Sequence, residues 1–127
     1  MAIQFNHTIV AARDAKASAT WLSEILGRDA PTSFGPFWAV TLDNSATLDF
    51  QHSDATLPIE HYAFLVSEAD FDAIFARICT RGLLYWADPM HRRPLEINRN
   101  DGGRGLYWND PDGHYLEIIT RPYGSRD

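Results

Sequence analysis

Three side chains of types that commonly bind metal ions lie on apolar stretches of the sequence: His7, His61 and Glu117. If these stretches are β-strands, alternate residues share a face, and each of the three then has apolar neighbours. Those neighbours are Phe5 and Ile9, Ile59 and Ala63, and Tyr115 and Ile119. An unpaired carboxylate is costly in such surroundings. A divalent metal bound by two imidazoles and one carboxylate would remove that cost and leave coordination positions open for water or substrate.

Each of these residues also has an interpretation that needs no metal. A single histidine on an apolar strand face is commonly a hydrogen-bonded core residue, and Glu117 could be the buried partner of an ion pair. The equivalent places of His7 and His61 in two similar halves of the chain favour a shared site. Two imidazoles and one carboxylate suit one Fe(II), Mn(II), Ni(II), Co(II) or Zn(II) ion per site. They do not show whether one chain completes the site.

Asp49 and Tyr107 are candidates for a catalytic role beside the metal. The segment 48–50 matches 116–118 in position within its half, so Asp49 corresponds to Glu117. Asp49 could then be a fourth ligand or a general base, or simply a carboxylate near the end of an exposed strand. Tyr107 precedes Glu117 by ten residues, one hairpin away, and could direct its hydroxyl to the metal or only fill space in the sheet.

The segment 88–104 has no clear periodicity and contains two prolines and two glycines. Loops of this length in small domains often cover or line a binding site. His91 is a candidate for proton transfer, and Arg92 and Arg93, with Arg99 and Arg104, would suit an anionic substrate. The alternative is that these arginines only solubilise an exposed loop. His114 lies on the opposite face of its strand from Glu117, and we expect it at the surface of a turn.

Two amphipathic helices follow the two histidine-containing strands. Gly27 follows His7 by 20 residues and Gly82 follows His61 by 21, and each glycine suits the left-handed end of a helix. Asp14 is the expected N-cap of the first helix, and Ser67 with Asp70 fits a capping box for the second. The apolar stripes have helical spacing. They comprise Ser18, Trp21, Leu22 and Ile25 in the first helix and Phe71, Ile74, Phe75 and Ile78 in the second.

Strand-like segments follow each helix, at 37–41 and 46–51 in the first half and at 84–87, 106–108 and 115–120 in the second. A turn at 110–113, Asp-Pro-Asp-Gly, joins the last two. The sequence thus predicts an α+β fold of two tandem βαβββ modules, about 1–55 and 56–127, within a single domain. Their strands would form a cupped mixed sheet with the helices on its outer face.

The bulk composition limits the classes of function. A chain of 127 residues with a net charge of −6 shows no basic face for nucleic acid or an anionic membrane. We expect no secretion signal and no membrane span, because the N-terminus lacks an apolar core and no apolar run approaches about 20 residues. With Cys79 as the single cysteine, a cytoplasmic protein is the expectation.

These motifs resemble the vicinal oxygen chelate superfamily, which includes glyoxalase I, extradiol dioxygenases, fosfomycin-modifying enzymes and bleomycin resistance proteins. The resemblance covers nearly the whole chain. It is carried by Phe5-Asn-His-Thr-Ile-Val10, Trp21-Leu-Ser-Glu-Ile-Leu-Gly27, Glu60-His-Tyr-Ala-Phe-Leu-Val66 and Leu106-Tyr-Trp-Asn-Asp-Pro-Asp-Gly-His-Tyr-Leu-Glu117. It implies paired βαβββ modules, metal ligands at His7, His61 and Glu117, a homodimer, and a metal that chelates neighbouring oxygens of a small-molecule substrate.

The individual branches of the superfamily fit less well. The segment 106–117 is similar to the extradiol ring-cleavage signature, but the histidine expected six to eight residues before Leu106 is absent. Fosfomycin enzymes place threonine where this chain has Ile9, and glyoxalase I places glutamate where it has Asp49. Bleomycin resistance proteins have the fold without the metal site.

Two classes of function remain open from the sequence. The first is a metal-dependent enzyme, a lyase, isomerase or dioxygenase, acting on a small oxygenated molecule through His7, His61 and Glu117. The second is a dimeric protein that sequesters a drug or metabolite in an aromatic-lined groove, which the strand tryptophans Trp38, Trp86 and Trp108 would favour.

Overall fold

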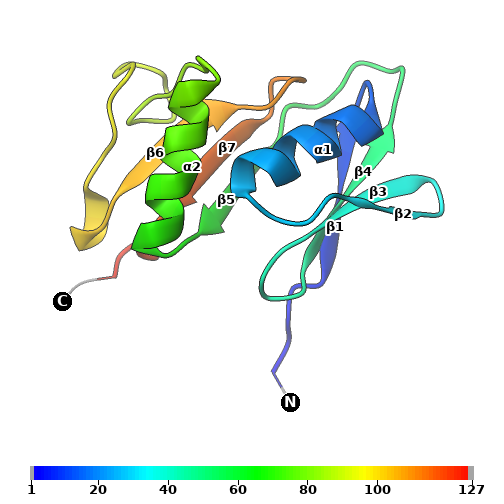
Figure 1. Cartoon of the computed structure of the whole chain (residues 1–127), viewed down its shortest axis with the longest axis horizontal. Coiled ribbons are helices and arrows are strands. Elements are labelled where there is room, and N and C mark those ends of the chain that lie inside the picture. Colours follow the sequence, from blue (N-terminus) through cyan, green and yellow to red (C-terminus); the bar gives the residue numbers. More distant parts are fainter. Residues whose placement is uncertain (1, 126–127) are drawn as a thin grey trace. The chain divides into compact units, whose positions relative to one another are not determined.

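The computed structural model describes residues 2–125. The chain separates into two compact units, Met1–Pro58 and Ile59–Asp127 (Figure 1). Each has its own sheet and its own helix, which confirms the α+β class predicted from the sequence. No helix among the described residues is long and apolar enough to cross a membrane.

The first unit is a four-stranded sheet with one helix. Its elements are β1 (His7–Ala12), α1 (Ala15–Leu26), β2 (Thr32–Phe34), β3 (Phe37–Thr41) and β4 (Thr47–His52). The strand order is β1-β4-β3-β2, with β1 parallel to β4 and the other pairs antiparallel. The helix begins at the predicted cap, where the Asp14 side chain accepts from the amide of Ala17, and ends at Gly27 with φ 70°. The short edge strand β2 was not predicted.

Strand alternation in this unit separates a buried face from an exposed one. Val10 of β1 and Phe50 of β4 are buried, as are Leu22 and Ile25 of α1. The helix contacts β1, β3 and β4. His7, on the other face of β1, is exposed. The core of the unit therefore lies between α1 and one face of the sheet.

The second unit repeats this plan with three strands. Its elements are β5 (His61–Leu65), α2 (Glu68–Thr80), a 3-10 turn η1 (Asn100–Gly102), β6 (Gly105–Asn109) and β7 (Tyr115–Ile119). The order is β5-β7-β6, with β5 parallel to β7 and β6 antiparallel to it. Ser67 caps α2 by accepting from the amide of Asp70, as predicted.

The strand predicted at 84–87 is wrong. Within the described chain this segment pairs only at Trp86, through isolated bridges to Pro94 and to Tyr107 of β6. It lies beside β6 as β2 lies beside β3 in the first unit. The segment forms no regular strand because the chain folds back after Trp86 and pairs this residue with Pro94. Proline has no amide hydrogen with which to extend a ladder of hydrogen bonds. The two modules are thus βαβββ and βαββ.

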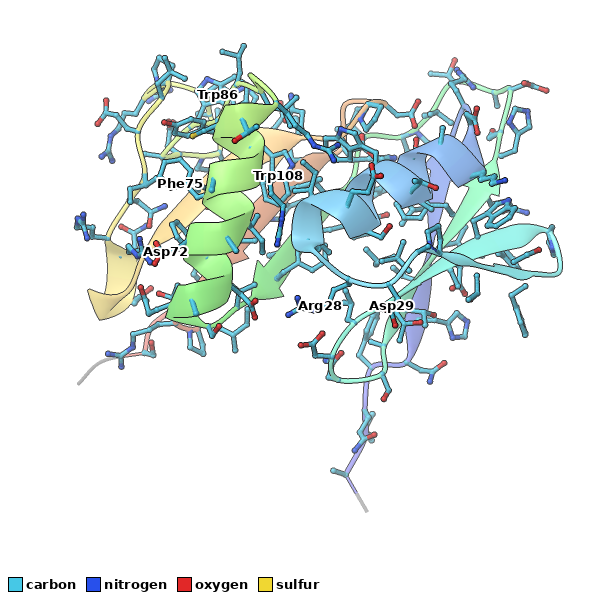
Figure 2. The ribbon with its side chains drawn as sticks, viewed as in Figure 1. Arg28, Asp29, Asp72, Phe75, Trp86 and Trp108 are labelled. Carbon is cyan, nitrogen blue, oxygen red and sulfur yellow. The ribbon has the colours of Figure 1, made fainter. Side chains whose placement is uncertain are left out.

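Arg104, just before β6, joins α2 to the sheet. Its guanidinium forms ion pairs with Glu68 at 2.7 Å and Asp72 at 2.8 Å and lies 4.4 Å from the ring centre of Phe71. Figure 2 shows Asp72 on the side of α2 that faces this segment. Burial lowers the pKa of Arg104, but hydrogen bonds to the two carboxylates outweigh it, so that pKa is raised overall. Arg104 therefore stabilises the fold.

We expect Arg104→Ala to lower the free energy of unfolding by about 1–2 kcal/mol, because it removes two partly exposed ion pairs and one cation–π contact. Chemical denaturation would measure the change. Arg104→Lys should recover part of it, since lysine keeps the charge but not the forked geometry. Arg92→Ala is the matched control, because the hydrogen bonds recorded for Arg92 come from its backbone amide. Equal stability of Arg104→Ala and wild type would contradict this assignment.

Candidate metal centre

His61 and Glu117 lie side by side on adjacent strands of the second unit. In the parallel pairing of β5 with β7, His61 is level with Tyr115 and Ala63 with Glu117, so both side chains lie on the same face. The His61 Nε2 and Glu117 Oε1 atoms are 3.0 Å apart. The His61 side chain is 48% exposed and that of Glu117 only 1%. The pair thus combines an accessible imidazole with a buried carboxylate.

Two tyrosines enclose the Glu117 carboxylate. The hydroxyl of Tyr123, after the last strand, donates to Oε2 of Glu117. The hydroxyl of Tyr107, level with Glu117 on β6, lies 3.3 Å from that of Tyr123. Burial raises the pKa of Tyr107 strongly, and hydrogen bonds with Tyr123 and Glu117 raise it further. Sequence reasoning missed Tyr123, because its position beside Glu117 depends on the path of the chain after β7, for which the sequence has no periodic signal.

Aromatic rings surround this pair on the same face of the sheet. Trp86 is bridged to Tyr107 and therefore shares the face of Glu117. The His91 ring lies between Trp86, with ring centres 3.6 Å apart and planes at 5°, and Tyr115, with centres 5.1 Å apart. Tyr107 stacks on His61 at 6.1 Å. The face that bears the carboxylate is therefore mostly aromatic.

The loop residues predicted to contact substrate lie close to this face, but their side chains are partly engaged. His91 has φ 59°, and its Nε2 is buried without a hydrogen-bond partner among the described residues. The backbone amides of Arg92 and Arg93 donate to the Asp88 carboxylate, which shapes the turn. The Arg93 side chain lies 3.6 Å from that of Glu96.

His7 and Asp49 belong to the first unit, where they have the same register as the pair in the second. Thr47 is level with His7, and Asp49 lies two residues further along β4, as Glu117 lies two residues beyond Tyr115. The shorter Asp49 is buried and accepts from the Thr47 hydroxyl at 2.8 Å. Nδ1 of the exposed His7 is 2.6 Å from Oδ1 of Asn6. Asp49 is thus not a carboxylate on an exposed strand end.

The position predicted for His114 is wrong. This residue is fully buried, not at the surface. Its Nδ1 accepts from the amide of Glu60 at 3.0 Å, and its ring meets that of Tyr62 edge to face. Leu116 and Ile118, on the face opposite Glu117, are buried in the core. His114 lies on this same face and is therefore directed into the protein.

The donors in the second unit fit a divalent metal. An imidazole nitrogen and a carboxylate oxygen are donors that divalent metals bind, and His61 Nε2 and Glu117 Oε1 lie 3.0 Å apart. Within the described part of either unit, no three His, Cys, Asp or Glu side chains form a group that could hold a metal. The second unit therefore offers two neighbouring candidate ligands, His61 and Glu117.

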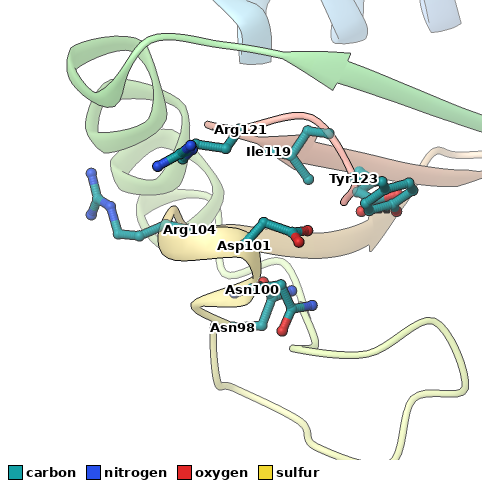
Figure 3. A pocket seen from close by; sticks show the side chains of 8 residues that line it. Asn98, Asn100, Asp101, Arg104, Ile119, Arg121 and Tyr123 are labelled. Carbon is teal, nitrogen blue, oxygen red and sulfur yellow. Dashed lines mark hydrogen bonds between the residues drawn. The ribbon is translucent and has the colours of Figure 1, made fainter. Parts of the chain in front are cut away.

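A small hollow adjoins the carboxylate. Glu117, Asp101 and Tyr123 contribute to its wall. Figure 3 shows Tyr123 at one end of the hollow and Arg104 and Arg121 at the other.

The chain is similar to two solved oxidases over its full length. It is 59% identical to Oxidase ChaP-H2, with a TM-score of 0.97 and all of both chains covered. It is 60% identical to Oxidase ChaP-H1, with a TM-score of 0.95, covering 98% of this chain and all of the other.

Among curated proteins, the chain is 30% identical to the glutathione transferase FosA of Serratia marcescens, over 95% of this chain and 83% of the relative. No family model matches the chain. The similarity thus extends over nearly all of the chain and includes both units.

Proposed function

The chain belongs to the vicinal oxygen chelate superfamily, and on this basis we propose that it is a metal-dependent oxidase acting on a small oxygenated aromatic substrate. The observation that carries the proposal is the buried Glu117 carboxylate beside the accessible His61 imidazole on an aromatic face. With His7 as third ligand, one divalent ion would have two imidazoles and one carboxylate and would keep positions open for substrate.

When bound, the metal would supply Lewis-acid stabilisation of negative charge on neighbouring substrate oxygens. The residues of the chain have separate tasks. Glu117 and the histidines hold the ion. The half-buried Trp86 offers ring surface to a planar substrate. The Tyr107 hydroxyl, which the hydrogen-bonded tyrosine pair holds close to Glu117, is placed to donate a hydrogen bond to a substrate oxygen.

Oxidation is preferred to lyase or isomerase chemistry because the two relatives of about 60% identity are oxidases. In this reaction the organic substrate loses electrons and dioxygen accepts them. The aromatic face supports a phenolic or quinone-like substrate, whose neighbouring oxygens can chelate one ion.

Thiol transfer is a second candidate, because the FosA relative is named as a glutathione transferase. Such an enzyme would add a thiol to an electrophilic substrate that is activated through its oxygens, and it would consume no dioxygen. A metal-free protein that binds a drug or metabolite on the aromatic face is the third.

We propose that the protein is a homodimer. Both ligand-bearing faces expose apolar side chains, namely Phe5 and Ile9 beside His7, and Leu65 at the other end of β5 from His61. Burial of these side chains in a dimer would remove their contact with water. Sedimentation of the metal-loaded protein would test this, and a monomer at micromolar concentration would contradict it.

Elemental analysis and oxygen uptake together test the proposed function. Untagged protein purified without chelator should contain about one divalent metal per chain and consume dioxygen with members of a panel of catechols and hydroxyquinones. Chelation should abolish the uptake and added metal should restore it. Glutathione consumption with an electrophile, without oxygen uptake, would instead support thiol transfer. Aromatic ligand binding by protein that takes up no added metal would support the binding protein.

A further inference from the structure

We propose that Tyr123 is a positioning residue that limits Glu117 to one metal-binding oxygen. This inference rests on the proposed metal site. It concerns how many coordination positions the protein occupies and how many it leaves for substrate.

The two oxygens of the Glu117 carboxylate have different partners. Oε1 faces His61 Nε2 at 3.0 Å, while Oε2 accepts from the Tyr123 hydroxyl. A carboxylate can bind a metal through one oxygen or through both, and a hydrogen bond to one oxygen favours binding through the other. Because Glu117 is 1% exposed, water has little access to Oε2 and cannot readily replace the tyrosine.

The chain after β7 brings Tyr123 to this place. Thr120 anchors its start, since the amide of Thr120 donates to the Arg104 carbonyl at 2.9 Å and its hydroxyl accepts from the Arg104 amide at 2.8 Å. Beyond Tyr123, the amide of Gly124 donates to Oδ1 of Asp101 at 3.2 Å, and Gly124 has φ 73°. Figure 3 shows Asp101 and Tyr123 on the same hollow. The segment is thus fixed on both sides of the tyrosine.

Tyr107 supports this role. Its hydroxyl lies 3.3 Å from the Tyr123 hydroxyl, and hydrogen bonds with both Tyr123 and Glu117 raise its pKa. Loss of the Tyr123 hydroxyl would remove the donor that directs Oε2 away from the ion. A bidentate carboxylate would then fill one position more, at the expense of substrate or water.

Cobalt titration tests the inference. Apo wild type, Tyr123→Phe and the control Tyr62→Phe would be titrated with Co(II), with calorimetry for affinity and visible absorption for coordination number. We expect Tyr123→Phe to bind Co(II) about 10-fold more weakly, because its outer-shell partner no longer holds the carboxylate in one orientation. We also expect weaker d–d absorption, because a second carboxylate oxygen raises the coordination number. Tyr62→Phe, next to His61 in sequence but directed to His114, should match wild type in both.

The outcomes separate this inference from the proposed function. If wild type binds Co(II) and Tyr123→Phe gives the same affinity and spectrum, the positioning role is wrong and the metal site stands. If wild type binds no Co(II), both proposals fail. Apo Tyr123→Phe should unfold at a somewhat lower temperature than apo wild type, because the change leaves the buried Oε2 without its donor.

A change at the anchor provides a second test that keeps every tyrosine. Asp101→Ala removes the acceptor for the Gly124 amide and should reduce Co(II) affinity in the same direction as Tyr123→Phe, by a smaller factor. Asp101→Asn keeps an oxygen acceptor and tolerates the left-handed backbone at this position, φ 58°, so it should restore wild-type affinity. Unchanged affinity in Asp101→Ala would show that this anchor does not hold Tyr123 in place.

Discussion

Replacing Glu117 with glutamine is expected to weaken metal binding by more than about 100-fold and to abolish turnover. Changes to residues that only support a ligand already cost about 10–100-fold in affinity, and glutamine at this position removes the negative charge of the ligand itself. Elemental analysis after dialysis and calorimetric titration would measure the loss.

The same variant distinguishes a ligand from a structural carboxylate. Without metal, the Glu117 carboxylate is buried almost completely, which costs free energy. A neutral amide of the same shape costs less to bury. The apo variant should therefore unfold at the same temperature as apo wild type or above it. A marked loss of stability with metal content unchanged would instead identify His61 and Glu117 as a structural ion pair. Glu60→Gln, an exposed change beside His61, is the control.

Trp108→Ala should produce the largest loss of stability, about 3–5 kcal/mol. Trp108 is fully buried on β6 and faces away from Tyr107, on the side covered by α2 (Figure 2). Truncation leaves a cavity that the sheet and helix can close only in part. The expected fall in melting temperature is about 10–20 °C, measured by calorimetry.

Two further variants make this prediction specific. The indole Nε1 of Trp108 is buried without a hydrogen-bond partner among the described residues. Trp108→Phe keeps most of the ring and removes that unpaired donor, so it should cost less than half as much as Trp108→Ala. Trp38→Ala, at a half-buried position on β3, should cost less than Trp108→Ala. If Trp38→Ala proved as damaging, burial of Trp108 would not be the cause.

The sequence predicted the regular elements well where periodicity and end signals agreed. Asp14 with Gly27, and Ser67 with the stripe from Phe71 to Ile78, located both helices. It failed at 84–87, where an apolar run resembles a strand but the chain turns back to pair with Pro94. It also missed β2, because three exposed residues carry no alternation.

The candidate site was predictable in part for similar reasons. Strand alternation predicted that Glu117 and Tyr107 share one face, and the register of β5 with β7 places His61 on that face too. Alternation alone does not show which face packs into the core, so the prediction for His114 was wrong. Tyr123 and the stacking of His91 between Trp86 and Tyr115 depend on irregular chain paths. The roles of His7 and Asp49 remain predictions that metal titration of their alanine variants would test.

The matching registers of β1 with β4 and β5 with β7 also bear on the ancestry of the protein. Two successive modules with the same parallel pairing of first and last strands and corresponding acidic positions are what the duplication of one ancestral gene segment would leave. The two modules differ by one methylene group at that position, aspartate in one and glutamate in the other. In the second copy the carboxylate reaches its histidine, and in the first it is bound by a neighbouring threonine. Of these two equivalent positions, only that in the second module has an acid–histidine contact among the described residues.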